Sequence, residues 1–347
     1  MNNFVLKYCL NLLNTRIKAK LVHSFIIIFF LSFNSQAQDV HFSSFDVNPM
    51  FLNPANSGFS SASFRLGTMY RNQWSTVSKG YNSYLFSAEA LLYNNRARKE
   101  GIGIGVNFLS DVAGSLSYGQ QNIGLSVSYF KAIEKKSEHY ISVGIQGNSS
   151  KWGYDLTHSV FGRELEDIEG IQLNTINTLD FGMGVHWQLK ANQQHYLQAG
   201  IALLHINQPT LSYYEDSDIK LPTKFNFYFS DLISLTELYS IKPTIFFQRQ
   251  NQYQEIIIGS DLNINMSETT LDSKILSFGA YYRTIDAFIA MIKYKHDNIN
   301  IGLSYDINLS KLTPASKTYG GVELWLLYSF NSLAYTRKTT SIPCPRF

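Results

Sequence analysis

Serine, histidine and aspartate side chains, which form the catalytic centres of nucleophilic hydrolases, recur along the chain; Ser126, Asp180 and His186 are examples. A hydrolase needs these three groups within hydrogen-bond reach of one another, and no spacing in the sequence singles out such a triad. The run GIGIG at residues 101–105 lacks the spacing of a phosphate-binding loop, and no helical pattern follows it. The eight histidines show no HExxH or paired-ligand spacing. The sequence therefore predicts no enzyme, no cofactor and no metal site.

Strict alternation of apolar and polar residues is the dominant pattern. In residues 299–310, INIGLSYDINLS, Ile299 and Leu303 share one parity, and Asn300 and Asp306 share the other. Side chains alternate between the two faces of a strand, so each such segment has one apolar and one polar face. About fourteen segments follow this pattern: residues 59–74, 80–92, 101–111, 118–131, 139–149, 175–190, 194–205, 221–232, 238–250, 253–265, 273–284, 286–296, 299–310 and 319–330.

Segments of this length match the 9–11 residues that a tilted strand needs to cross a bilayer. A soluble β-sandwich also alternates, but its solvent faces carry Lys and Glu, whereas the polar faces here are mostly Gly, Ser, Asn and Gln. Charged residues make up 16% of the chain, below the ~25% typical of soluble domains. A bilayer cannot satisfy an open strand edge, so the strands must close on themselves. We therefore predict an all-β fold, a transmembrane antiparallel β-barrel of about 14 strands.

The N-terminal residues have the pattern of a secretory signal peptide, with a basic start, the apolar run LVHSFIIIFFLSF and small residues before Gln38. The alternative is a membrane anchor, for which the apolar run is short. Cys9 would leave with the signal peptide, and a single remaining Cys344 predicts no internal disulfide. The predicted organisation is a signal peptide (1–37), an N-terminal plug segment (38–58), an outer-membrane barrel (59–330) and a periplasmic tail (331–347).

The formal net charge of +3 gives no reason to expect nucleic-acid binding. Four basic residues lie among the first twenty, and without them the net charge is −1 (3 − 4). If the mature N-terminus starts in the periplasm, the connections that follow odd-numbered strands face outward, and these include the two longest, 150–174 and 206–220. Short periplasmic turns and long outer loops are typical of outer-membrane barrels.

Strand parity also predicts that several charged residues point into the barrel. We expect them either to pair with one another and fill or plug the lumen, or to form a selectivity filter in an open pore, which a conductance measurement would distinguish. The predicted lumen charges are Arg65, Arg71, Glu89, Asp180, Asp261, Lys293, Lys295, Asp306 and Glu323.

Residues 40–58, VHFSSFDVNPMFLNPANSG, precede the first strand and carry too many apolar residues for a free linker. The Asn48–Pro49 and Asn53–Pro54 pairs favour extended or turn geometry, so we expect the segment to be non-helical at both points. We expect it to pack inside the periplasmic mouth of the barrel.

Motifs at both ends of the mature chain resemble one family. The N-terminal QDVHFSSFDVNPMFLNPANSG, the RNQW run from Arg71 to Trp74, the segment YDINLSKLTPASKTYGGVELWLLYSF and the closing CPRF together resemble the PorP/SprF family of Bacteroidetes outer-membrane proteins. The chain departs from the family pattern at Asn56, where a small residue such as alanine is expected. This departure leaves the geometry of that turn open.

The resemblance implies a role in type IX secretion, with outer-membrane lipid around the barrel. Its implied partners are a large secreted cargo protein with a type B C-terminal domain, such as a gliding-motility adhesin, and periplasmic or peptidoglycan-associated components of the secretion machinery. Asn53, Pro54, Arg71 and Trp74 are the candidate residues for a functional cluster at the barrel mouth. Alternatively, they stabilise the plug against the first strand. The competing hypothesis for the whole protein is a transporter or porin for small hydrophobic solutes, similar to fatty-acid transport barrels with an N-terminal hatch.

Overall fold

The computed structural model describes ten stretches of the chain: residues 39–60, 62–73, 80–95, 97–114, 118–134, 138–153, 175–212, 219–267, 273–310 and 316–330. The chain divides into two compact units, Met1–Asp39 and Val40–Phe347, and only the second is described below. The expected signal peptide, the expected tail and Trp74 lie outside the described residues.

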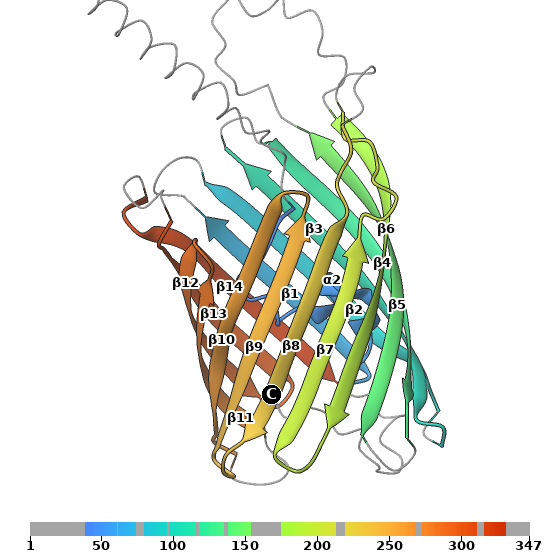
Figure 1. The fold of residues 1–347 in the computed structure, drawn as a ribbon, viewed down its shortest axis with the longest axis vertical. Helices are drawn as coiled ribbons and strands as arrows, with labels where there is room; N and C mark the ends of the chain where they lie inside the picture. The colour runs from blue at the N-terminus through green and yellow to red at the C-terminus, as the bar shows by residue number, and fades with distance from the viewer. Residues whose placement is uncertain are drawn as a thin grey trace, which may run out of the picture. The chain divides into compact units, whose positions relative to one another are not determined.

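Fourteen antiparallel strands form a closed barrel (Figure 1). Each strand pairs with its neighbours in sequence, and the first also pairs with the last, so that Arg71 lies opposite Glu323 across the closing seam. The predicted fold class and strand number are confirmed. The strands are Phe64–Gln73 (β1), Tyr81–Asn95 (β2), Glu100–Ala113 (β3), Tyr118–Ala132 (β4), His139–Gly153 (β5), Thr175–Lys190 (β6), His195–Leu204 (β7), Lys224–Ser234 (β8), Tyr239–Gln250 (β9), Tyr253–Asn265 (β10), Lys274–Arg283 (β11), Ala287–His296 (β12), Ile299–Asn308 (β13) and Tyr319–Phe330 (β14).

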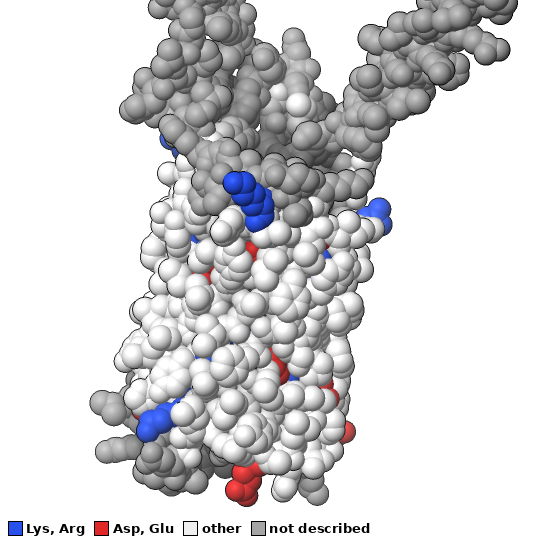
Figure 2. All heavy atoms as spheres, turned by 90° about the vertical axis from the view of Figure 1, so that its left-hand side faces the viewer, with Lys and Arg blue, Asp and Glu red and all other residues white. Residues whose placement is uncertain are grey.

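The two faces of the strands have the predicted chemistry. On β13 the outward Ile299 and Leu303 are 43% and 40% exposed, whereas the inward Asp306 is 2% exposed. Figure 2 shows one side of the barrel wall, where a broad band of uncharged residues lies between protruding charged side chains near the two ends. An outward apolar band of this kind suits contact with hydrocarbon. In the part of the chain that the structure describes, no helix has the length and apolar character needed to cross a membrane.

The two ends of the barrel differ in their connections. We call the end with the connections 154–174 and 205–223 the long-loop end. The opposite end, with the connections 191–194, 235–238 and 297–298, is the short-turn end. The first strand begins and the last strand ends at the short-turn end, because each antiparallel strand reverses direction.

Residues 40–58, which we call the plug, lie inside the barrel and contain two short helical turns, Pro49–Leu52 (α2) and Pro54–Asn56 (η1). The asparagine before each proline is non-helical as expected, with φ/ψ of −121°/77° at Asn48 and −153°/115° at Asn53. The turns that follow were not predicted. Proline suits the first position of a helix because its missing N–H has no intrahelical acceptor there.

Candidate functional site: the plugged lumen

The plug is fixed near the long-loop end by a buried group of charges. Both carboxylate oxygens of Glu323 accept plug backbone N–H groups, from Ser43 at 2.6 Å and from Ser44 at 2.8 Å. Arg71 donates to Glu323 and also pairs with Asp306, with 3.2 Å between Nη2 and Oδ2. Glu323 is 0% exposed and Arg71 2%. A fully buried carboxylate that accepts two backbone N–H groups ties the strand to the plug.

A second arginine completes this group, which we call the anchor and define as Arg71, Arg283, Asp306 and Glu323. Arg283 Nη1 lies 3.1 Å from Asp306 Oδ2, and both guanidinium groups donate to Ser43 Oγ of the plug. A charge in such a site is tolerated only when it is paired and hydrogen-bonded, and removal of one partner of a buried pair costs about 3–5 kcal/mol. Moving Ser43 away from the wall would break these contacts, so the anchor holds Ser43 in place.

His41 of the plug lies close to the same charges. Burial and the positive charges of Arg283 and Arg71 hold the pKa of its imidazole well below the ordinary value of 6.5. Its Nε2 is 3.9 Å from Glu255 Oε2. The side chain is therefore neutral in the folded protein at neutral pH.

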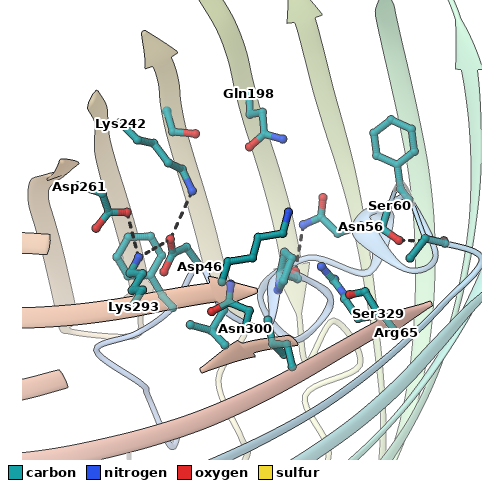
Figure 3. A pocket seen from close by; sticks show the side chains of 18 of the residues that line it. Asp46, Asn56, Ser60, Arg65, Gln198, Lys242, Asp261, Lys293, Asn300 and Ser329 are labelled. Atoms are coloured by element: carbon teal, nitrogen blue, oxygen red, sulfur yellow. Dashed lines mark hydrogen bonds and ion pairs between the residues drawn. The ribbon is translucent and has the colours of Figure 1, made fainter. Parts of the chain in front are cut away.

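A second group of charges holds the middle of the plug on the short-turn side, as Figure 3 shows. Asp46 Oδ2 lies 3.3 Å from Lys242 Nζ and 3.0 Å from Lys293 Nζ, and Lys293 also reaches Asp261 Oδ2 at 2.9 Å. We call these four residues the lysine clamp. Burial alone would raise the pKa of the Asp46 carboxyl, but the two ammonium groups hold that pKa far below its usual range. Asp46 is therefore ionised, and its negative charge offsets positive charge of the two lysines on the wall.

The end of the plug is fitted closely against the wall on the β2–β7 side. Asn53 Nδ2 donates to the backbone oxygens of Val185 (2.9 Å) and Ile201 (3.3 Å), and a Cβ on Gly184 would lie 2.0 Å from Asn53 Oδ1. Gly58 donates its N–H to Glu89 Oε2 at 2.8 Å. It has φ +61°, in the left-handed region that favours glycine.

Between the plug and the short-turn end lies a cavity of about 290 Å³, which we call the vestibule (Figure 3). Its lining combines the lysine clamp with Lys295, with amides and hydroxyls, and with aromatic rings. Buried polar atoms in this lining that have no hydrogen-bond partner among the described residues include Asn300 Oδ1 and Trp325 Nε1. A smaller cavity of about 20 Å³ lies beside the plug in the long-loop half, next to Phe42 and Phe246. Within the ranges that the structure describes, no group of three or more His, Cys, Asp or Glu side chains is placed to hold a metal ion.

Comparison with known families identifies the chain. The profile of "Type IX secretion system membrane protein PorP/SprF" matches residues 34–328. The chain belongs to the PorP/SprF family. This confirms the resemblance that the end motifs suggested. No curated protein sequence matches the chain.

Several solved structures similar to this PorP/SprF protein are titled as transporters or channels. The toluene transporter TodX of Pseudomonas putida has a TM-score of 0.50 at 10% identity, covering 82% of this chain and 93% of that one. The toluene transporter TbuX of Ralstonia pickettii has a TM-score of 0.49 at 13% identity, with coverage of 82% and 93%. A FadL homologue of Pseudomonas aeruginosa has a TM-score of 0.47 at 10% identity, covering 82% and 94%. At such identities the likeness concerns the fold alone.

The structure places the residues that were candidates for a functional cluster in two parts of the wall. Asn53 and Pro54 contact the inner faces of β5 to β7, where a Cβ on Gly144 would lie 2.5 Å from the Pro54 carbonyl oxygen. Arg71 instead bonds to Ser43 and to the acids of β13 and β14. Trp74 lies outside the described residues. Contacts between the plug and the wall, the second role considered for this set, are present for Asn53, Pro54 and Arg71.

The predicted lumen charges all lie on inward faces, and most of them pair with other side chains inside the barrel. Arg65 Nε donates to Glu89 Oε1 at 2.8 Å. Asp180 accepts from Asn148 Nδ2 at 3.1 Å and lies 3.1 Å from His205 Nδ1. Asp261, Lys293, Asp306 and Glu323 belong to the anchor or the lysine clamp, and Lys295 lines the vestibule.

Three charged residues of the site were missed by the sequence analysis: Asp46, Lys242 and Arg283. Strand parity held the necessary information for two of them, because Lys242 alternates with the outward Ile241 and Arg283 with the outward Tyr282. Asp46 gave no comparable pattern, since the plug has no strand period. Asn56, the departure from the family pattern, donates from Nδ2 to Pro49 O and Tyr228 Oη, both at 2.9 Å. The larger side chain therefore has partners of its own.

Proposed function

We propose that this protein is an outer-membrane docking platform of the type IX secretion system. In this role it acts in the secretion or surface attachment of one large cargo protein with a type B C-terminal domain. Membership of the PorP/SprF family supports the secretion system. The observation that favours docking over conduction is the plug, which is tied to the charged wall of β1 and β9 to β14 by the anchor and the lysine clamp. A barrel filled in this way offers a rigid surface at each end rather than an open pore.

In this proposal the short-turn end faces the periplasm and the long-loop end faces the exterior, as is usual for outer-membrane barrels. Periplasmic and peptidoglycan-associated components would then meet the short turns and the vestibule, while the cargo would meet the long loops. The protein would work by binding alone, without catalysis, cofactor or metal.

A transporter of small hydrophobic solutes is the alternative, and the fold that this chain shares with the toluene transporter TodX keeps it under consideration. Sites for apolar ligands are lined mainly by hydrophobic and aromatic side chains. The vestibule instead mixes lysines, carboxylates and amides with its aromatic and apolar residues. This mixed lining favours docking.

The two functions separate in a deletion strain. Deletion of the gene is expected to leave one large cargo protein inside the cell or to release it from the surface, while uptake of hydrophobic solutes is unchanged. Re-expression of the wild-type chain should restore surface display, measured by antibody labelling of intact cells. Normal display with reduced uptake would replace the docking proposal with the transporter. Porin-sized conductance of the purified protein in planar bilayers would also contradict the filled lumen.

A further inference from the structure

The lysine clamp has one feature that a purely structural cluster does not need: it faces the vestibule. Asp46, Lys242, Lys293 and Asp261 all line that cavity, so a molecule entering from the short-turn end reaches them directly. The barrel wall itself supplies two ammonium groups and one carboxylate to the clamp. The plug supplies the second carboxylate through Asp46, the only acidic residue between positions 40 and 58. Without Asp46 the wall is left with an excess positive charge.

We propose that the vestibule binds an acidic peptide segment whose carboxylate competes with Asp46 for Lys242 and Lys293. In this exchange one carboxylate replaces another between the same two ammonium groups, so no buried charge is left unpaired. Asp46 would then be free to leave, and with it the middle of the plug. Peptide binding at the short-turn end would thus loosen the plug from the wall.

The remaining lining favours a peptide over a simple anion. The unpartnered atoms Asn300 Oδ1 and Trp325 Nε1 are an acceptor and a donor, as are the two halves of a peptide group. Gln198 projects toward the same space from β7 (Figure 3). Aromatic rings of Tyr196 and Phe59 add apolar surface. A volume of about 290 Å³ lies near the lower limit of ~300–1,000 Å³ for small-molecule sites, which suits the tip of a loop or a chain end.

The identity of the ligand as a segment of a periplasmic partner rests on the proposed function, but the binding chemistry does not. Purified protein in detergent can therefore be tested with two fluorescein-labelled peptides, Gly-Ser-Glu-Ser-Gly and Gly-Ser-Gln-Ser-Gly, by fluorescence anisotropy. The glutamate peptide is expected to bind more tightly than the glutamine peptide. Asp46→Asn, which removes the competing charge, should strengthen glutamate-peptide binding on the order of tenfold, within the range typical of coupled sites.

Lys242→Met should weaken this binding, whereas Lys151→Met, a change of the same type at an exposed position of β5, should not. Equal affinity for the two peptides, or no gain in Asp46→Asn, would overturn the proposal. A second measurement needs no change to the clamp. In a Val47→Cys protein without other cysteines, the glutamate peptide should accelerate thiol labelling of the plug relative to the glutamine peptide, and equal labelling rates would also overturn it. None of these results depends on secretion. The peptide-binding proposal can therefore fail while the docking function stands, and the docking function can fail while peptide binding is observed.

Discussion

Glu323→Gln offers the most direct test of the anchor. The change preserves the shape of the side chain but replaces one carboxylate oxygen with an NH₂ group. Glu323 now accepts from the N–H groups of Ser43 and Ser44 and from Arg71. An amide can serve only part of this set, and its NH₂ group would face one donor directly. Arg71 would retain Asp306 at 3.2 Å, so the charge would keep one partner.

The size of the effect follows from these contacts. Breaking a buried ion pair costs about 3–5 kcal/mol, and the remaining partner places Glu323→Gln at the low end, about 3 kcal/mol. The strands of the barrel keep all their backbone hydrogen bonds, so the change should act on local release of the plug rather than on unfolding of the barrel. Since about 1.4 kcal/mol corresponds to a factor of ten, the open population should rise on the order of 100-fold.

The assay is the labelling rate of a single thiol in the plug. Val47 is 6% exposed and directly follows Asp46 of the lysine clamp, so Val47→Cys in a background with Cys9→Ser and Cys344→Ser reports plug release. The matched control is Glu100→Gln, which alters a glutamate that is 8% exposed but contacts Lys131 and Arg98 rather than the plug. Equal labelling rates in Glu323→Gln and Glu100→Gln would refute the anchor.

Three further perturbations test other parts of the plug, each by urea unfolding in detergent. Gly58→Ala should destabilise the protein by about 1–3 kcal/mol, and by more than Gly114→Ala, because both have positive φ but only at Gly58 would the new Cβ meet backbone, 2.5 Å from Ala90 O. Burial and two arginines lower the pKa of His41, so below about pH 6.5 the unfolded chain takes up a proton that the folded protein does not. The free energy of unfolding should therefore fall as the pH is lowered from 7.5 to 5.5. It should fall less steeply in His41→Gln, which lacks the titrating group. Asn56→Ala and Tyr228→Phe should each destabilise the protein, with a double-mutant coupling of about 0.5–1.5 kcal/mol from their hydrogen bond; additive effects would contradict it.

Most of the barrel could be predicted because the strand pattern is local. Alternation along residues 299–310 or 319–330 depends on a period of two, which each segment shows by itself, and the same parity identifies inward charges. The pairing of those charges is not local. Arg71 and Glu323 are 252 residues apart and meet only because the last strand closes on the first. No pattern within either segment contains that information.

The course of the plug was beyond prediction for a related reason. The plug was expected in the periplasmic mouth, which in the proposed orientation is the short-turn end. Ser43 bonds to Glu323 and Arg71 near the long-loop end, and Gly58 reaches Glu89 toward the short-turn end. The segment therefore runs along the lumen. A chain with only two short helical turns has few internal hydrogen bonds, so its path depends on partners supplied by distant strands.

The inner faces of β3 to β6 show what those partners require. A chain inside a barrel must satisfy its backbone groups, and the wall supplies donors for this purpose: Ser128 Oγ and Ser142 Oγ each donate at 2.6 Å, to Ser57 O and Ala55 O. Glycines beside these serines make the approach possible, because a Cβ on Gly103, which lies opposite Ser128 in the sheet, would be 2.0 Å from Ser57 O.

The Gly- and Ser-rich polar faces are thus not simply the lining of a water-filled pore. On this side they fit the plug by shape and hydrogen bonding, whereas the anchor and the lysine clamp, from β1 and β9 to β14, hold it by charge. A charged ligand has little effect on contacts that depend on shape. Ion pairs, by contrast, can exchange one partner for a charged group of the ligand. A partner that acts on the plug would therefore have its effect at the charged wall, where the vestibule gives access to the lysine clamp.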